Sequence, residues 1–326
     1  MRVFLYPYLV NLYNPYISNF YNALSKCNLM TNRTNLSSHH WILVDMMLKC
    51  LKTDVLILNW PENTAFRRGG VLQVFFYIIT FFLYKILNKK IIYVYHNKVP
   101  HFGHSFLSRL CASVTLRFSS KIIVHAKSGI SFLKSNYSFL SSDKIHFNIH
   151  PVYSSKLIKL ENSNYLYDFI IWGSIIKYKG IVKFLAEMSQ EIISKNIRLL
   201  IIGQCIDKNY YHEIKALVEK NKNIKFINSF VSDSDLKQYI SMSKSILFVY
   251  EPASVLSSGS LMKSLNYSKS IIGPDSDGFR DLKNVNMINV YKGYEEIFSF
   301  SNNFDEKSRV KFLLDKTWDN LVKKIF

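Results

Sequence analysis

Short apolar runs that alternate with helical patterns constrain this chain more than any other feature. The runs lie at residues 2–5, 54–58, 91–95, 121–124 and 144–147, and again at 168–172, 198–202, 224–227, 245–250 and 270–273. Patterns typical of amphipathic helices separate most of them, for example over residues 15–27 and 105–118. Strands that alternate with helices are typical of a parallel sheet. The sequence therefore predicts an α/β protein with two halves that share no sequence repeat.

One helix start in the second half is suited to binding phosphate. Residues 257–260 (Ser-Ser-Gly-Ser) follow the run at 245–250, and apolar residues recur at helical spacing over 261–265. Ser257 or Ser258 can cap this helix, and Gly259 lets a ligand approach the backbone closely. A helix start presents unpaired N–H groups and a partial positive charge, which favour an anion. The alternative is an ordinary capped helix without a ligand.

Size and charge indicate two domains with different surroundings. At 326 residues the chain suits two domains of ordinary size, and 48% hydrophobic residues suffice for real cores. Residues 1–160 carry 19 Lys and Arg against 4 Asp and Glu, whereas residues 161–326 carry 23 against 19. Such a basic first half favours an anionic membrane face, a phosphate-bearing acceptor or nucleic acid as a partner. A lysine-rich genomic composition is the competing explanation.

Two features bear on the cellular location. Residues 71–87 are mostly apolar and lie between the basic pairs 67–68 and 89–90, but they reach only the lower limit for a spanning helix. We expect a core helix with one face resting on a membrane, and a spanning helix is the alternative. No signal peptide is predicted, and the four cysteines lack the spacing of metal ligands. We therefore expect a cytoplasmic protein with reduced thiols.

Histidines follow three of the predicted strands in the first half. His96, His125 and His150 each come within a few residues of the end of an apolar run. If all strands are parallel, their carboxyl ends share one edge of the sheet, and the three histidine loops lie on that edge. Ligands of open α/β sheets bind there. The polar segment 154–166 is a candidate linker to the second half.

Four stretches of the chain resemble bacterial glycosyltransferases of the GT-B architecture, nearest to the family-four, group-1 type. They are 96–101 (His-Asn-Lys-Val-Pro-His), 150–153 (His-Pro-Val-Tyr), 173–180 and 258–281. The resemblance extends over nearly the whole length and implies two Rossmann-like domains that face each other across a cleft. It implies an acceptor-side domain over 1–160 and a nucleotide-sugar-binding domain over 161–304. It also implies a C-terminal helix over 305–326 that packs back on the first domain.

The resemblance also implies which residues hold the donor. Lys179 and the backbone amides of Ser258, Gly259 and Ser260 are expected to hold the donor diphosphate. His96 matches a first-domain histidine that approaches the donor sugar, so His96 and Lys179 are the catalytic candidates. For both, a purely structural role is the alternative. The other donor-binding candidates are Gly173, Ser174, Lys177, Gly203, Phe230, Val231 and Glu251. The acceptor-side candidates are Asn14, Trp60, Glu62, Asn97, His101 and His125.

The chain departs from the family pattern at two places. Relatives often have an arginine shortly before the lysine, where this chain has Ile176, with Lys177 as the candidate substitute. Many relatives have two glutamates separated by seven residues. Here Glu251 has Gly259 at that spacing, and in a second alignment Lys263 takes the place of the later glutamate. Glu251 therefore either contacts the ribose or only caps a loop.

These features predict a hexosyl-type glycosyltransferase that moves a sugar from a nucleotide-sugar to a saccharide acceptor. The acceptor is expected to be lipid-linked, in surface polysaccharide or glycoconjugate synthesis, at the inner face of the membrane. The family mechanism retains configuration, and the leaving phosphate oxygen helps to deprotonate the acceptor. An inverting enzyme would need a base such as His96, His101 or Glu62. Amides and a lysine can neutralise the leaving group, so no metal or other cofactor is expected.

Two other functions stay open on the sequence. The basic first half, together with 24 Phe and 21 Tyr in the whole chain, is compatible with a nucleic-acid-binding protein. Against this, the aromatic residues lie in apolar runs rather than among Lys and Arg. The missing second glutamate is compatible with a catalytically inactive sugar-binding homologue. Donor-dependent sugar transfer would exclude both functions.

Overall fold

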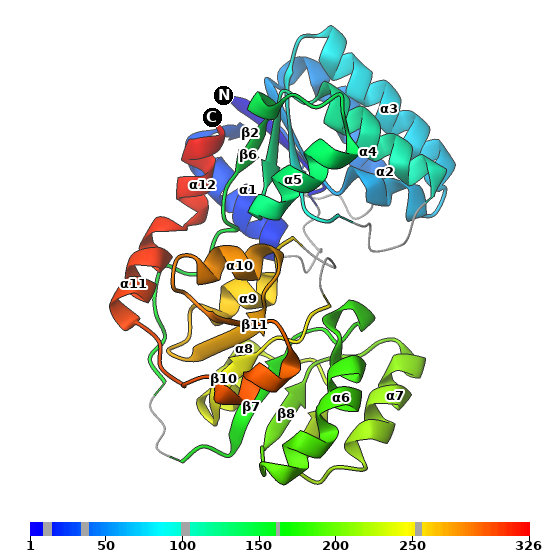
Figure 1. The fold of residues 1–326 in the computed structure, drawn as a ribbon. Helices are drawn as coiled ribbons and strands as arrows, with labels where there is room; N and C mark the ends of the chain where they lie inside the picture. The colour runs from blue at the N-terminus through cyan, green and yellow to red at the C-terminus, as the bar shows by residue number, and fades with distance from the viewer. Residues whose placement is uncertain (9–14, 34–38, 99–104, 161–163, 252–255) are drawn as a thin grey trace. The chain divides into compact units, whose positions relative to one another are not determined.

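The computed structural model describes residues 1–8, 15–33, 39–98, 105–160, 164–251 and 256–326, without the side chains of residues 39–40. The chain divides into two compact units. The first comprises Met1–Pro151, Val255–Ser257 and Trp318–Phe326, and the second comprises Val152–Ser254 and Ser258–Thr317. Both ends of the chain therefore belong to the first unit (Figure 1).

The first unit contains a six-stranded sheet in the order β2-β1-β3-β4-β5-β6, with each strand parallel to its neighbours. The strands are β1 (Arg2–Tyr6), β2 (Leu29–Met30), β3 (Val55–Asn59), β4 (Lys90–Tyr95), β5 (Lys121–Val124) and β6 (Ile145–Phe147). The helices are α1 (Pro15–Cys27), α2 (His39–Leu48), α3 (Gly70–Ile86), α4 (Phe106–Phe118), α5 (Lys127–Asn136) and α12 (Trp318–Ile325).

Helices cover both faces of this sheet, because alternate side chains of a strand point to opposite faces. On one face, Phe4 and Leu56 pack in a core with residues of α2, α3, α4 and α5. On the other face, Val3 and Val55 pack in a core with residues of α1 and α12. An ion pair between Lys26 Nζ and Asp319 Oδ2, at 2.8 Å, also joins α1 to α12.

The second unit contains another six-stranded sheet, in the order β12-β11-β10-β7-β8-β9 and again parallel throughout. The strands are β7 (Tyr167–Trp172), β8 (Leu199–Ile202), β9 (Ile224–Ile227), β10 (Ser243–Leu247), β11 (Ser270–Pro274) and β12 (Asn289–Tyr291). The helices are α6 (Ile181–Ser194), α7 (Lys208–Val218), α8 (Asp233–Ser241), α9 (Gly259–Ser264), α10 (Asp277–Lys283) and α11 (Glu306–Asp315).

The predicted α/β class with two parallel sheets is confirmed, and the differences have local causes. β2 and β12 were not predicted because they have only two and three residues. α2 was not predicted because it is apolar on its exposed side, at Trp41, as well as on its buried side, at Ile42. The tail that was predicted as one helix is two, with α11 in the second unit and α12 in the first.

The candidate linker at 154–166 is bound along the second unit at residues 154–160 and 164–166, and residues 161–163 lie outside the described residues. Ile158 pairs with Tyr267 in a parallel bridge. The side-chain amide of Asn266 donates to the carbonyl oxygens of Ser154 and Lys156 at 2.6 and 2.9 Å. Hydrogen bonds rather than apolar burial hold this segment, so its polar composition gave no sign of the contact.

Candidate functional site

Two glycines bring the ends of neighbouring strands into contact at the carboxyl edge of the second sheet. Gly173 follows β7 and Gly203 follows β8, with φ angles of 99° and 153°. A side chain on Gly203 would place its Cβ 2.0 Å from the carbonyl oxygen of Gly173. Only glycine permits so close an approach. Gly173 and Gly203, two of the predicted donor-binding residues, therefore present backbone atoms without side chains to a ligand.

Lys179 lies beside Gly173 and is only 4% exposed. A Cβ built on Gly173 would lie 3.0 Å from Lys179 Nζ. The ammonium donates to the carbonyl oxygen of Trp172 at 3.5 Å and lies 5.5 Å from the centre of the Tyr250 ring. Within the described part of the chain, no carboxylate pairs with it. A buried ammonium without an opposite charge is unfavourable, so an anionic ligand would stabilise this arrangement.

The start of α9 lies next to the same glycine. Ser258 caps this helix, because its Oγ accepts a hydrogen bond from the backbone N–H of Leu261 at 3.3 Å. The Tyr250 hydroxyl lies 3.0 Å from both Ser258 Oγ and Ser260 Oγ. A Cβ on Gly173 would lie 3.7 Å from Ser260 Oγ. Strand-end backbone, a buried ammonium and a helix start thus converge, and together they suit a diphosphate.

The other donor-binding candidates are less buried. Ser174, Lys177, Phe230 and Glu251 are exposed, and Val231 is half-buried. Lys177 Nζ lies 3.6 Å from Asp207 Oδ2, so its charge already has a partner on this chain. Tyr250 was not among the candidates, although it directly precedes Glu251. Its contacts reach residues that are eight and ten positions away in sequence, and no local pattern indicates them.

Lys263, in the place of the later family glutamate, forms an ion pair with Asp233 and lies 5.9 Å from the centre of the Trp172 ring.

Asp233 and Asp235 form one of two Asp-x-Asp sequences in the chain, and the other is at 275–277. Among the residues that the structure describes, no three His, Cys, Asp or Glu side chains gather as a metal site. The expectation of a metal-independent reaction requires that Lys179 and the N–H groups at the start of α9 neutralise the leaving group in place of a metal.

In the first unit, six rings surround Tyr16 near the carboxyl edge of the sheet. Phe20 lies on the same helix, and the others come from distant segments: Trp60, His96, His125, His150 and Trp318. The prediction that the three histidine loops share an edge is confirmed. The ring centre of His125 lies 5.7 Å from that of His96 and 5.2 Å from that of His150. Tyr16 and Trp318 were not among the candidates, because α1 and α12 bring them here from the two ends of the chain.

Hydrogen bonds decide where His125 carries its proton. Nδ1 lies 2.7 Å from the carbonyl oxygen of Asn148, which can only accept, so Nδ1 is the protonated atom. Nε2 therefore accepts from the Tyr16 hydroxyl at 2.8 Å. Burial lowers the pKa of His125 to about 4, so this imidazole is neutral at pH 7.

Trp60 and His96, two of the predicted site residues, lie face to face. Their ring centres are 4.1 Å apart and their planes differ by 21°. Trp60 has a φ of 48°, a backbone conformation that is uncommon outside glycine and often occurs at functional sites. The amide nitrogen of Asn59 donates to the carbonyl oxygen of Tyr6 at 3.1 Å, so its Oδ1 accepts from His96 Nε2 at 3.0 Å.

The remaining acceptor-side candidates differ in their surroundings. Glu62 is 5% exposed and accepts a hydrogen bond from the Tyr93 hydroxyl at 3.0 Å. Burial raises the pKa of this carboxyl to about 7. Asn97 is also buried. Asn14 and His101 lie outside the described residues.

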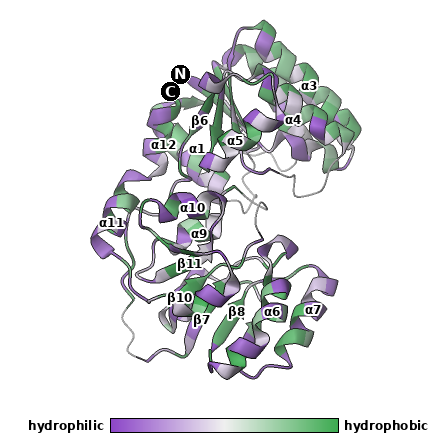
Figure 2. Cartoon of the chain, in the orientation of Figure 1, coloured by the Kyte–Doolittle hydropathy of each residue, from purple (hydrophilic) through white to green (hydrophobic). Residues whose placement is uncertain are grey.

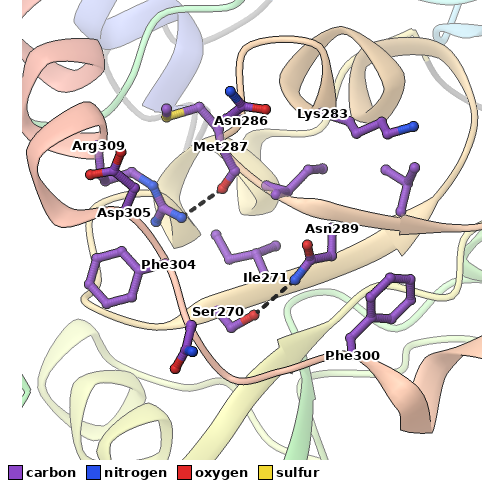
Figure 3. Close-up of a pocket in the computed structure, with 13 residues that line it drawn as sticks. Ser270, Ile271, Lys283, Asn286, Met287, Asn289, Phe300, Phe304, Asp305 and Arg309 are labelled. Atoms are coloured by element: carbon purple, nitrogen blue, oxygen red, sulfur yellow. Dashed lines mark hydrogen bonds between the residues drawn. The ribbon is translucent and has the colours of Figure 1, made fainter.

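A separate pocket of about 300 Å³ lies at the opposite, amino edge of the second sheet (Figure 3). The first residues of β11 and β12 line it, together with α11 and the segment before it. On its wall, the buried guanidinium of Arg309 turns toward Met287 and donates to the carbonyl oxygen there at 2.7 Å. None of the predicted donor residues lines this pocket, so it is distinct from the predicted donor site.

The sequence matches no protein-family model and no curated protein. The structure is similar to HepE from Anabaena, solved with UDP and glucose, with a TM-score of 0.61 and 11% identity over 100% of this chain and 95% of HepE. It is similar to the lipopolysaccharide outer core galactosyltransferase WaaB, with a TM-score of 0.64 and 12% identity over 100% and 99%. A glycosyltransferase from Rickettsia africae matches with a TM-score of 0.63 and 14% identity over 99% and 96%. The chain therefore has the two-sheet architecture of GT-B glycosyltransferases.

We expect Glu62→Gln to change how stability depends on pH. The folded state holds the pKa of Glu62 at about 7, against 4.5 ordinarily. A carboxyl whose pKa is raised by folding contributes stability below its ordinary pKa and loses it as the pH rises through the raised value. From pH 5 to pH 8, the wild type should therefore lose about 2.5 kcal/mol of unfolding free energy relative to Glu62→Gln.

Urea unfolding followed by tryptophan fluorescence measures this difference, because three of the four tryptophans, Trp41, Trp60 and Trp318, belong to the first unit, and Trp172 belongs to the second. The exposed Glu213→Gln, on α7, is the control and should follow the wild type at every pH. Parallel pH profiles for the wild type and Glu62→Gln would show that the buried carboxyl does not titrate in this range.

Proposed function

We propose that this protein is a glycosyltransferase that moves a sugar from a nucleotide-sugar to a saccharide acceptor. The observation that carries the proposal is the buried ammonium of Lys179, which has no carboxylate partner in the described chain and lies beside Gly173 and the start of α9. A diphosphate fits this group because it is anionic and can accept hydrogen bonds from backbone N–H groups. The glycosyltransferase fold, and the structures of HepE with UDP and with UDP-glucose, support a nucleotide diphosphate as the ligand.

In the proposed reaction, an acceptor hydroxyl oxygen bonds to the anomeric carbon of the donor sugar, and the bond from that carbon to the donor phosphate breaks. Negative charge grows on the leaving diphosphate. Lys179 and the amides of Ser258, Gly259 and Ser260 stabilise this charge without a metal. The hydroxyl proton passes to the leaving phosphate oxygen, and configuration is retained. His96 would contact the donor sugar.

Exposed apolar side chains near the glycines offer a surface for the nucleobase. Phe230 and Ile206 are 78% and 83% exposed. A hydrogen bond of 2.7 Å from the backbone N–H of Cys205 to Asn228 Oδ1 ties together the loops that carry them. A planar base that stacks on Phe230 would cover apolar surface that now faces water.

The aromatic and histidine rings around Tyr16 support the acceptor assignment to the first unit. Stacked Trp60 and His96 offer a flat apolar surface, and hydrogen-bonding atoms lie beside it. Such a combination suits a saccharide, which has apolar faces and many hydroxyls. We propose a lipid-linked saccharide of a surface polysaccharide or glycoconjugate as the acceptor, with Asn97 and His125 among its neighbours.

The exposed face of α3 supports docking on a membrane. Figure 2 shows this helix mostly in the colour of hydrophobic residues. Its exposed apolar side chains are 38% to 79% accessible: Val71, Leu72, Phe75, Phe76, Ile79, Phe82 and Ile86. Arg68 and Lys85 are exposed near its two ends. Over the residues described, no helix is long and apolar enough to cross a bilayer. An apolar face with basic flanks fits a helix that lies in the interface of an anionic membrane, here the inner face of the cytoplasmic membrane.

Lys179→Ala should weaken the binding of UDP, measured by calorimetry, by about tenfold to a hundredfold, because a hydrogen bond to a charged group contributes about 1.5–3 kcal/mol. Its thermal midpoint should not fall much, since the ammonium has no ion pair to lose. Lys177→Ala is the matched control, because Lys177 is exposed and pairs with Asp207. Equal UDP affinity in Lys179→Ala and the wild type would show that the diphosphate does not bind beside Lys179.

Gly259→Val should abolish UDP binding while far-UV circular dichroism stays that of a folded α/β protein, because the side chain would occupy the space at the helix start. The Cβ would also lie 2.8 Å from the Tyr153 hydroxyl. Tyr153→Phe in the same variant separates the two effects. Recovery of binding would assign the loss to a displaced Tyr153, whereas a persistent loss is what the proposal requires.

Membrane docking predicts sedimentation with phosphatidylglycerol liposomes at low salt. Arg68→Glu/Lys85→Glu should reduce binding through charge, at about 1 kcal/mol per basic residue. Phe75→Ser/Phe76→Ser should reduce it through lost apolar insertion. Lys222→Glu/Lys225→Glu makes the same charge change on exposed positions of the second unit and should bind normally. If the wild type ignores these liposomes, the exposed face of α3 binds something other than an anionic bilayer.

A further inference from the structure

The three histidines near Tyr16 use their ring nitrogens differently. His125 uses both, because Nδ1 donates to the carbonyl oxygen of Asn148 and Nε2 accepts from the Tyr16 hydroxyl. His96 donates from Nε2 to Asn59. Both residues therefore commit ring nitrogens to their own chain.

His150 differs from these two. Its Nδ1 lies 2.7 Å from the carbonyl oxygen of Pro151, which can only accept, so Nδ1 carries the proton. Nε2 is then left as a lone pair, and no hydrogen-bond partner for it exists in the described ranges. The side chain is 5% exposed, so bulk water hardly reaches it. Among the described residues, Nε2 does not belong to the fully buried polar atoms that lack a partner, so the small exposed area of the side chain leaves this lone pair open to a hydrogen-bond donor.

A second polar group without a partner lies next to His150. The indole N–H of Trp318 is buried and has no acceptor in the described structure. The ring centre of Trp318 lies 5.8 Å from that of His150, and both rings contact Tyr16. The neighbours are thus an acceptor that lacks a donor and a donor that lacks an acceptor. A hydroxyl group both donates and accepts, so it has the chemistry to pair with either group.

We infer that His150 Nε2 accepts a hydrogen bond from a hydroxyl of the saccharide acceptor, with the Trp318 indole N–H as a candidate donor to the same hydroxyl. This inference rests on the proposed function, and it adds two residues that no sequence pattern assigned to the acceptor side. His150 orients the hydroxyl and does not take its proton. Burial, followed by the neighbouring His125, lowers the pKa of His150 to about 3, so its imidazole stays neutral. The proton therefore still passes to the leaving phosphate.

Acceptor kinetics test the inference, with UDP-glucose, UDP-galactose and UDP-N-acetylglucosamine as donors and octyl glycosides as acceptors. His150→Leu should raise the acceptor KM about tenfold, because a polar group of the acceptor loses its partner. The donor KM should stay unchanged, and His150→Gln, which can place an oxygen near Nε2, should restore most of the acceptor affinity. His146→Leu, on β6, is the matched control. An unchanged acceptor KM in His150→Leu, or an equal change in both KM values, overturns the inference.

A measurement without turnover separates this inference from the proposed function. In ¹⁵N spectra of the histidine side chains, methyl glycosides should move the Nε2 resonance of His150 and leave that of His146 in place. UDP binding without such movement for any glycoside refutes the role of His150 and leaves the donor site intact. Absent UDP binding refutes the proposed function, and the glycoside titration then decides on His150 alone. If only water fills the place, no glycoside moves the resonance, which also overturns the inference.

Discussion

Every strand in both sheets is parallel to its neighbours, and this constraint decides where the second unit can bury charge. Helices that connect parallel strands begin at the carboxyl edge of the sheet and end at the amino edge. Their ends carry a partial negative charge. At the amino edge, buried Lys269 donates to the carbonyl oxygen of Ser241, the last residue of α8, at 3.2 Å. Arg309 likewise donates to Leu265, at the end of α9, at 3.4 Å. Helix-end carbonyls thus accept hydrogen bonds from two buried cations, and no carboxylate among the described residues forms an ion pair with either.

The parallel arrangement of the strands also explains why Lys179 differs from Lys269 and Arg309. It lies at the carboxyl edge, where helices begin and their partial charge is positive. The start of α9 therefore repels this ammonium, whereas the ends of α8 and α9 attract Lys269 and Arg309. Among the described residues, Lys179 has one long hydrogen bond, to the carbonyl oxygen of Trp172, and a contact with the ring of Tyr250. A bound diphosphate would offset the repulsion between the Lys179 ammonium and the start of α9, because both would then attract the same anion.

The sequence was sufficient for the parallel sheets, for the glycines at strand ends and for the shared edge of the histidine loops. Each of these follows from local pattern and from strand direction. Tyr16 and Trp318 could not be predicted, because their contacts join segments that are far apart in sequence. Tyr250 could not be predicted, because no local pattern indicates its contacts with Ser258 and Ser260. A helix with one exposed face was expected over residues 71–87, but which residues form that face could not be predicted. Its apolar residues lie on both the buried and the exposed side, and only the packing shows which ones face water.

The division of the tail into α11 and α12 has a consequence for folding during synthesis. Residues 318–326 complete a unit that otherwise consists mainly of residues 1–151. Until α12 emerges from the ribosome, Phe20 and Leu24 on α1 lack the apolar cover of Leu321 and Ile325. The second unit, by contrast, is complete once residue 317 has been made. The first unit begins the chain but also contains its last-made residues, so part of its apolar core stays uncovered until synthesis reaches α12, and uncovered apolar surface favours aggregation.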